Sequence, residues 1–262
     1  MTPNPWLNRA RPLSIAHRGH SLEVPENTLE AYRRAVELGI DMIECDVNST
    51  RDGELVMIHD WSLDRTTDGS GRVRALTLDE IGRLDAGSWF GPEFRGVRVP
   101  TTIEAIELGR EAGIEMCFEV KGETPDDYLA TALALADLFV ARGVLGWAFM
   151  SSYDHAALAA AKARVPELLL APERLPDDVP PPPGEGVRQA AALGAPVLQN
   201  HWAFITPELV SSLHANGVAL WSWPTTAESE IAASLAAGAD GVMGDDAAAL
   251  VRAVAGVAGR PR

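Results

Sequence analysis

The chain has 262 residues, of which 47% are hydrophobic and 23% are charged, and this composition is that of a folded globular protein. Its formal net charge is −15 at pH 7, so its surface repels DNA, RNA and anionic lipid headgroups, and we expect no nucleic-acid partner. The length fits one large α/β domain or two smaller domains. If such a protein acts on an anion, it must create the attraction locally, against its own global field.

The beginning of the chain and its cysteines predict a cytoplasmic protein. The N-terminal residues include Arg9 and Arg11 but no apolar run of the kind that marks a secretory signal. We expect no membrane span, because polar residues and prolines interrupt every uncharged stretch. Two cysteines, Cys45 and Cys117, are too few for a disulfide framework, and thiols stay reduced in the cytoplasm.

Short apolar runs alternate with alanine-rich helical stretches along the chain. In chain order we expect strands over residues 13–16, 42–47, 55–58, 115–120, 147–151, 168–171, 196–199, 218–223 and 241–243. We expect helices over 27–38, 102–111, 126–141, 154–163, 187–193, 206–215, 227–236 and 247–254. Six glycines occupy the position where a left-handed residue commonly ends a helix, namely Gly39, Gly113, Gly143, Gly194, Gly217 and Gly238.

This alternation predicts the fold. Strands that alternate with helices form a parallel sheet with right-handed crossovers. Eight such pairs, with 55–58 as an additional extended piece, favour a (β/α)₈ TIM barrel that spans residues 1–262 as a single domain. An open, doubly wound sheet is the alternative. Residues 61–100 contain only a short helical piece and are expected to form a small insertion on one face of the barrel.

Polar residues cluster where the predicted strands end. Catalytic residues of a βα barrel lie at the carboxyl ends of its strands. The residues found there are His17, Arg18, Glu44, Asp46, His59, Glu119, Lys121 and His201, with Trp221 on the next strand. We expect the first seven to converge on one rim, whereas for His201 a substrate contact and a structural role both stay open.

Three of these residues predict a metal site. Glu44 and Asp46 are two residues apart on one strand, so they point to the same side, and Glu119 comes from a neighbouring strand. Three carboxylates in a barrel mouth repel one another unless a divalent cation binds between them. Ligands that are all oxygens favour Mg²⁺, Ca²⁺ or Mn²⁺ over Zn²⁺. Carboxylates that are salt-bridged or solvated are the alternative.

The remaining charges suit a phosphodiester. With a bound divalent ion and the cations of Arg18 and Lys121, the predicted pocket carries about +1, which a phosphodiester monoanion neutralises. Arginine binds phosphate oxygens bidentately and lysine adds a point charge, although a structural ion pair of Arg18 and a surface position of Lys121 are alternatives. His17 and His59 end strands that face the same acidic cluster, which indicates a general acid and a general base.

Several motifs together resemble one known family. Their order and spacing in the first half of the chain resemble the glycerophosphodiester phosphodiesterase family, and they are His17-Arg18-Gly19, Pro25-Glu26-Asn27-Thr28, Glu44-x-Asp46, His59-Asp60, Leu63-Asp64-Arg65-Thr66-Thr67 and Phe118-Glu119-Val120-Lys121. The C-terminal half matches less closely. Trp221 fits the family's pattern on its strand, whereas Trp223, Pro224 and Gly244 depart from it. These departures concern the surface that receives the alcohol half of a substrate.

The resemblance implies a (β/α)₈ barrel and a role for each matched residue. It implies that Glu44, Asp46 and Glu119 hold a divalent metal, that His17 and His59 are the acid–base pair, and that Arg18 and Lys121 contact phosphate. Trp221 is a candidate substrate contact, and Glu26 and Asn27 are candidates for supporting the ligands. Asn27 is also expected to cap the first helix, with Glu30 three residues later.

The function implied is metal-dependent cleavage of a glycerophosphodiester into sn-glycerol 3-phosphate and an alcohol. His17 would activate the nucleophile and His59 would protonate the leaving oxygen, although the two roles can be exchanged. The nucleophile is either water or the 2-hydroxyl of the substrate. A lysophospholipase D activity is the alternative, with an aromatic lip for an acyl chain formed by Trp202, Phe204, Trp221 and Trp223. A non-catalytic phosphate-ligand binder is a minor alternative. The leaving alcohol, the metal used and the oligomeric state stay open.

The cysteines test the predicted strand register. Cys45 lies between Glu44 and Asp46, so its side chain is expected to point away from the site towards the helices. Cys117 lies two residues before Glu119 and is expected to point into the barrel. We therefore predict that the two thiols lie on opposite faces of the sheet and form no disulfide.

Overall fold

The strands form a nearly closed parallel barrel. A computed structural model describes residues 4–7 and 9–257. The hydrogen-bonded order of the sheet is β6-β5-β4-β2-β1-β9-β8-β7, with strands β1 (Leu13–His17), β2 (Met42–Ser49), β4 (Glu115–Val120), β5 (Ala148–Ser151), β6 (Leu169–Leu170), β7 (Val197–His201), β8 (Ala219–Thr225) and β9 (Gly241–Gly244). A parallel bridge between Glu173 and Gln199 joins the two outer strands just beyond β6. This closure confirms the TIM barrel and excludes the open sheet.

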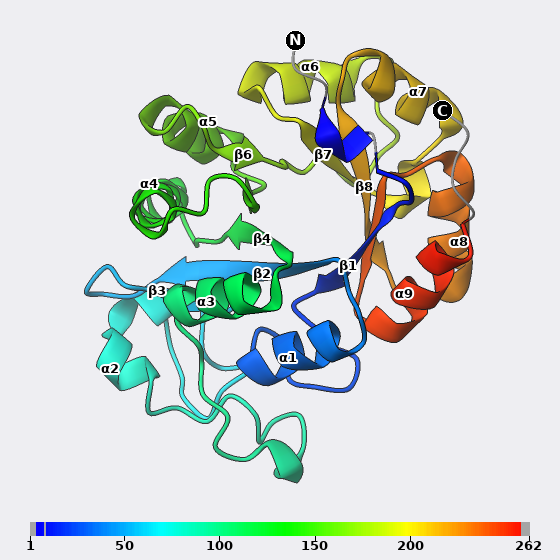
Figure 1. Cartoon of the computed structure of the whole chain (residues 1–262). Coiled ribbons are helices and arrows are strands. Elements are labelled where there is room, and N and C mark those ends of the chain that lie inside the picture. The colour runs from blue at the N-terminus through cyan, green and yellow to red at the C-terminus, as the bar shows by residue number, and fades with distance from the viewer. Residues whose placement is uncertain (1–3, 8, 258–262) are drawn as a thin grey trace.

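Helices surround the strands in chain order, as Figure 1 shows. They are α1 (Leu29–Glu37), α3 (Thr102–Ala112), α4 (Pro125–Arg142), α5 (His155–Arg164), α6 (Glu185–Leu193), α7 (Pro207–Ala215), α8 (Glu228–Ala237) and α9 (Ala247–Ala255). Threonine or aspartate hydroxyl and carboxylate oxygens cap most of them, as Thr101 does for α3 and Thr124 for α4. The six predicted glycines all have positive φ, which confirms their place at the helix ends.

Alternate residues of each strand divide the buried side chains into two cores. Ile15, Met42, Cys117, Phe149 and Trp221 point inward and fill the barrel. The intervening residues, among them Ile43, Cys45 and Phe118, pack against the helices. The cysteine prediction is therefore confirmed, because both thiols are free and they belong to different cores.

The N-terminal segment covers one end of the barrel. The short 3₁₀ helix η1 (Pro5–Leu7) places Trp6 edge-to-face on Phe149, with ring centroids 4.8 Å apart. The Asn4 amide donates to the backbone oxygens of Pro196 and Gly217, before β7 and β8. This end lies opposite the carboxyl ends of the strands, so the N-terminal segment leaves the mouth at those ends uncovered.

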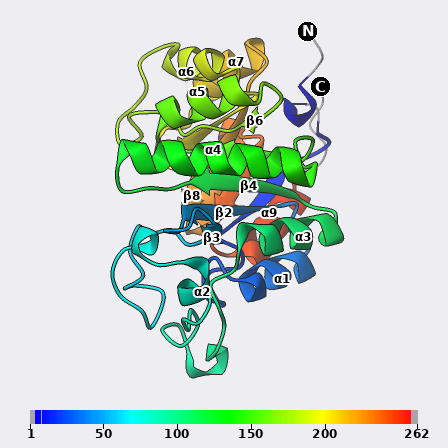
Figure 2. The same cartoon turned by 90° about the vertical axis from the view of Figure 1, so that its left-hand side faces the viewer.

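Residues 61–100 lie outside the ring of helices, beside α1 and α3, in both views (Figures 1 and 2). The segment follows β3 (Leu55–Met57), which pairs antiparallel with β2, and contains α2 (Leu78–Ile81) and the 3₁₀ turns η2 (Val73–Ala75) and η3 (Pro92–Phe94). Its apolar side chains form a small core of their own around Leu63, Val73 and Ile81. Across the described residues, no helix combines the length and the apolar character that a bilayer crossing requires.

Candidate active site

The register of three neighbouring strands brings the acidic residues together. His17 pairs with Glu44 between β1 and β2, and Asp46 pairs with Glu119 between β2 and β4. One carboxylate oxygen each of Glu44, Asp46 and Glu119 lie within 4.8 Å of one another, and all three residues are buried. The alternation that predicted a shared face is thus what builds the triad.

The triad is electrostatically strained as a group of bare carboxylates. Burial, together with the charges of Asp46 and Glu119, raises the pKa of Glu44 well above its ordinary value. Burial also opposes ionisation of Asp46, but the Lys121 ammonium and the Arg18 guanidinium lower the pKa of Asp46 overall. Glu44 Oε1 accepts no hydrogen bond from the described residues, whereas Asp46 Oδ1 lies 3.2 Å from the Lys121 ammonium. One buried carboxylate oxygen of the triad therefore has no donor in the described part of the chain.

Arg18 reaches this centre from an unusual backbone turn. Arg18 has φ 58° and Gly19 has φ 85°, which is a region that arginine seldom adopts. A Cβ atom on Gly19 would lie 2.7 Å from the backbone of Ala31. The turn points the Arg18 guanidinium into the mouth, where Nε lies 3.0 Å from Asp46 Oδ2 and Nη1 donates to Glu26 Oε1 at 2.8 Å.

The second cation of the site is held by two members of the triad. Lys121 Nζ lies 2.5 Å from Glu119 Oε1 and 3.2 Å from Asp46 Oδ1. Its ammonium also lies 5.9 Å from the centre of the Tyr153 ring. Lys121 is buried rather than at the surface, and the attraction of Glu119 and Asp46 overcomes burial and raises the pKa of Lys121.

Each predicted catalytic histidine has a carboxylate on one ring nitrogen. His17 Nδ1 lies 2.7 Å from Asp245 Oδ1, and His17 Nε2 lies 3.9 Å from Glu44 Oε2. His59 Nδ1 lies 2.7 Å from Asp60 Oδ1. A carboxylate at Nδ1 orients each ring and leaves Nε2 as the nitrogen that it does not contact.

Comparison with known proteins decides the family. The sequence pattern described as "Glycerophosphoryl diester phosphodiesterase family" matches residues 17–249. The chain belongs to this family. It is 37% identical over 245 residues to a glycerophosphodiester phosphodiesterase of Caldanaerobacter subterraneus, covering 92% of this chain and 97% of that protein. A glycerophosphodiester phosphodiesterase of Bacillus altitudinis is 32% identical, covering 88% of this chain and 93% of that protein.

Solved structures support the same family. A phosphodiesterase of Oleispira antarctica, solved in complex with the product sn-glycerol-3-phosphate, is 31% identical. It superposes with a TM-score of 0.83 over 94% of this chain and 97% of that chain. A glycerophosphodiester phosphodiesterase of Agrobacterium tumefaciens shares the fold, with a TM-score of 0.80 at 24% identity over 92% and 99% of the two chains.

One local prediction within the family motif is wrong. Asn27 does not cap the first helix, because α1 begins at Leu29 and Thr28 Oγ1 accepts from the Ala31 amide. Asn27 has φ 56°, and its side chain makes two hydrogen bonds to Asp46 instead. Asn27 Nδ2 donates to Asp46 Oδ2 at 2.7 Å, and Asn27 Oδ1 accepts from the Asp46 amide at 3.1 Å. The same motif places Glu26 between Arg18 and Arg65, so that it orients the Arg18 guanidinium.

Trp221 and His201 lie at different depths. Trp221 is fully buried in the barrel, 4.9 Å from the Phe149 ring, and its indole Nε1 has no hydrogen-bond partner among the described residues. His201 lies higher, at the rim, where its ring is 5.7 Å from Trp223. Their roles as substrate contacts stay predictions.

The sequence interpretation missed two polar groups of the site. Asp245 directly follows β9, and Glu173 lies three residues beyond β6, so both occupy carboxyl ends of strands. Glu173 is buried, and burial together with the Glu119 charge raises its pKa well above the ordinary value. Their position beyond a strand was the available signal.

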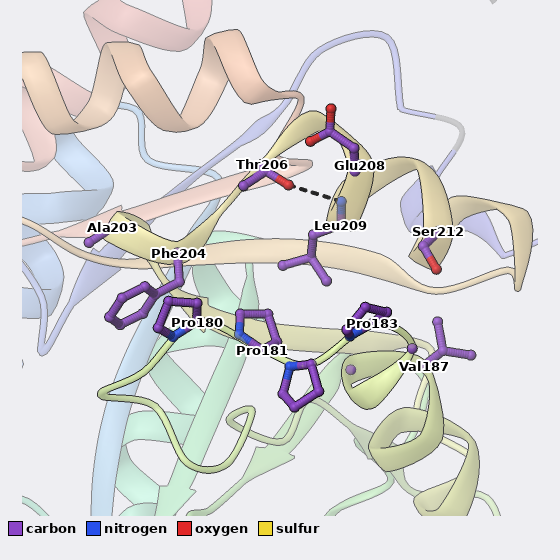
Figure 3. Close-up of a pocket in the computed structure, with 13 residues that line it drawn as sticks. Pro180, Pro181, Pro183, Val187, Ala203, Phe204, Thr206, Glu208, Leu209 and Ser212 are labelled. Carbon is purple, nitrogen blue, oxygen red and sulfur yellow. Dashed lines mark hydrogen bonds between the residues drawn. The ribbon is translucent and has the colours of Figure 1, made fainter.

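Two cavities adjoin this rim. A cavity of about 520 Å³ is lined by His59, Asp60, Trp61, Ser62, Lys121, Gly122 and Tyr128. An apolar pocket of about 410 Å³ lies between α6 and α7, where prolines from Pro180 to Pro183 face Leu209 and Phe204 closes one end (Figure 3). The first adjoins the catalytic groups, whereas the second contains no catalytic candidate.

Proposed function

We propose that this protein hydrolyses glycerophosphodiesters to sn-glycerol 3-phosphate and an alcohol. The observation that carries the proposal is the convergence of two carboxylate-bound imidazoles, His17 and His59, on a buried carboxylate triad flanked by Arg18 and Lys121. Phosphoryl transfer needs in-line proton transfers and cations around the phosphate, and this site offers both. The Oleispira antarctica relative, which binds sn-glycerol-3-phosphate, supports the choice of substrate.

The triad fits a divalent cation. Glu44, Asp46 and Glu119 would hold it, because their oxygens converge and Glu44 Oε1 has no hydrogen-bond partner among the described residues. Carboxylate oxygens are hard ligands, which favour Mg²⁺, Ca²⁺ or Mn²⁺. A bound cation would supply charge stabilisation for the phosphate oxygens. Asn27 holds Asp46 in place from behind, so this ligand is oriented before any ion binds.

The two imidazoles divide the proton transfers. Burial, with help from Lys121 and Arg18, lowers the pKa of His59, so its neutral form prevails near pH 7 and can accept a proton. Asp245 lies against His17 Nδ1 and orients the ring, which leaves Nε2 as the nitrogen that can act as the donor. These contacts favour the exchanged assignment, in which His59 activates the nucleophile and His17 protonates the leaving oxygen.

The pH dependence of kcat/KM tests this assignment. Activity is expected to fall as the pH drops through the pKa of His59, and this acid limb should lie below about pH 6.5, the ordinary value for histidine. The Asp60 carboxylate raises the pKa of His59, so Asp60→Asn should move the limb to still lower pH. A limb that moves upward, or that does not move, would contradict His59 as the base.

Asp245→Asn tests the orientation of His17. The substitution removes the charge that faces Nδ1 while keeping the size of the side chain, and we expect kcat to fall about 10- to 100-fold. Ser21→Ala is the matched control, because its hydroxyl contacts the same Asp245 oxygen and the His17 backbone oxygen but not the His17 ring. If both variants raise KM to the same extent and leave kcat unchanged, Asp245 has only a structural role.

The proposed activity is tested with a panel of glycerophosphodiesters assayed with Mg²⁺, Ca²⁺ and Mn²⁺. Release of sn-glycerol 3-phosphate from at least one diester is the expected result, and no release with any ion would refute the proposal. Reaction in ¹⁸O-labelled water, with a search for a cyclic phosphate, distinguishes attack by water from attack by the substrate's own 2-hydroxyl.

A second candidate activity acts on lysophospholipids. Ring contacts lead from Lys121 through Tyr153, Trp223 and His201 to Phe204, with successive separations of 5.9, 5.8, 5.7 and 5.6 Å. Phe204 borders the apolar pocket of Figure 3, which could take an acyl chain. Turnover of lysophosphatidylcholine above that of glycerophosphocholine would establish this activity, and the reverse order would exclude it as the main one.

We infer one barrel domain with a small insertion at 61–100, because that segment's core adjoins the barrel through β3. The two buried, reduced thiols agree with the cytoplasm as its location.

A further inference from the structure

Glu173 lies at the barrel mouth and takes no part in the proposed proton transfers or in the carboxylate triad. Leu169 and Ala171 point into the barrel, so Glu173 faces the same side, one step nearer the carboxyl end. Its bridge to Gln199 closes the barrel between β6 and β7. The residue is only 3% exposed, and it lies outside the carboxylate triad.

One oxygen of the Glu173 carboxyl group has a hydrogen-bond partner among the described residues, and the other has none. Glu173 Oε1 accepts from Gln199 Nε2 at 3.2 Å, and the same amide nitrogen is fixed by the backbone oxygen of Ala171 at 2.8 Å. Glu173 Oε2 has no hydrogen-bond partner among the described residues. A buried polar atom without a partner is costly, and such atoms in native proteins call for a functional explanation.

The neighbouring residues limit which group can form a hydrogen bond with Glu173 Oε2. Lys121 is already engaged by Glu119 and Asp46, so it does not pair with Glu173 at hydrogen-bond distance. A phosphate oxygen is better matched by the cations of Arg18 and Lys121 and by an ion in the triad, which leaves Glu173 Oε2 for an uncharged group. A hydroxyl group suits, because it donates to the carboxyl oxygen and carries no charge.

We propose that Glu173 is a specificity-determining residue that binds a free hydroxyl of the glycerol half of the substrate, with Gln199 as its positioning residue. The substrates would thus be diesters whose retained alcohol is a polyol, and simple alkyl phosphodiesters would be discriminated against. This inference rests on the proposed function for the identity of the polyol. A site built to bind a hydroxyl rejects the analogue that lacks it, since its buried polar atom is then left unpaired.

Calorimetric titration of the Mg²⁺-loaded protein with two probes tests the inference. The probes are sn-glycerol 3-phosphate and n-propyl phosphate, which differ only in the two hydroxyls. We expect the wild type to bind the first between about 10-fold and 100-fold more tightly. Glu173→Leu should bring the ratio close to one through loss of affinity for the glycerol phosphate, whereas Glu173→Gln, which keeps an acceptor, should be intermediate.

The ratio separates recognition from structural damage, because a damaged site loses affinity for both probes equally. Glu37→Leu is the matched control, since Glu37 lies exposed at the far end of α1. A ratio near one in the wild type, or the same ratio in the wild type and both Glu173 variants, would overturn the inference. If the Glu173→Leu variant does not fold, the Glu173→Gln variant alone tests the inference. A Glu173-dependent ratio in a protein that hydrolyses no glycerophosphodiester would uphold the inference on ligand binding and refute only the proposed function.

Discussion

Removal of the divalent ion is expected to abolish substrate binding as well as turnover. Without the ion, a phosphodiester anion would approach the carboxylates of Glu44, Asp46 and Glu119 in a protein whose net charge is −15. Arg18 and Lys121 cannot compensate, because both are paired with these or neighbouring carboxylates. One unit-charge interaction at 4 Å is worth about 4 kcal/mol at an effective dielectric constant of about 20. That energy corresponds to about three orders of magnitude in affinity.

The measurement is calorimetric titration of sn-glycerol 3-phosphate into chelator-treated protein, beside an assay of hydrolysis. We expect no measurable binding, a loss of turnover of more than about 10³-fold, and recovery of both when the ion is restored. An unchanged affinity in the metal-free protein would refute the idea that the ion supplies the attraction for phosphate.

Glu44→Gln sharpens this test. Glu44 Oε1 has no hydrogen-bond partner among the described residues, and Oε2 accepts only from the Arg18 amide at 3.2 Å, so the substitution removes a ligand charge with little disturbance. The variant should need a much higher concentration of the ion for half-maximal activity. Glu115→Gln is the matched control, because Glu115 begins the strand that carries Glu119 and pairs with Arg9 at the opposite end.

The triad could be predicted because strand geometry is local. A period of two places Glu44 and Asp46 on one face, and parallel pairing of neighbouring strands brings Glu119 beside them. The same reasoning placed Cys45 and Cys117 on opposite faces, as observed. Three of the acidic residues that make the chain so negative are therefore buried in the triad and are not part of the charged surface.

The supporting residues could not be predicted because strand register does not determine which side chains at the mouth pair with one another. Asp245 contacts His17 across 228 residues, and Glu173 contacts Gln199 across 26. Asn27 shows a different failure. Its sequence context fits a helix cap equally well, and only the left-handed backbone turn directs its amide to Asp46. Spacing therefore predicted which residues face the mouth, but not which side chains hold them in place.

Replacing either catalytic histidine is expected to lower kcat by about 10²- to 10⁴-fold, which is the usual contribution of general acid–base catalysis. His17→Gln and His59→Gln should each leave the affinities for Mn²⁺ and sn-glycerol 3-phosphate within a few-fold of the wild type, because neither imidazole belongs to the triad. The double variant should lose less than the product of the single losses, since the two groups act in one reaction. His214→Gln is the matched control, because His214 pairs with Asp240 at the far end of the barrel.

The leaving group then distinguishes the acid from the base. A 4-nitrophenyl ester of glycerol phosphate releases a stable anion, so its departure does not depend on a proton donor. We expect His17→Gln to regain most of its activity on this substrate and His59→Gln to regain none, because His17 protonates the leaving oxygen and His59 activates the nucleophile. Recovery in His59→Gln alone would restore the original assignment. Recovery in neither variant would show that neither imidazole acts mainly as the acid for the leaving oxygen. The contacts of the two rings with Asp245 and Asp60 would then not distinguish an acid from a base.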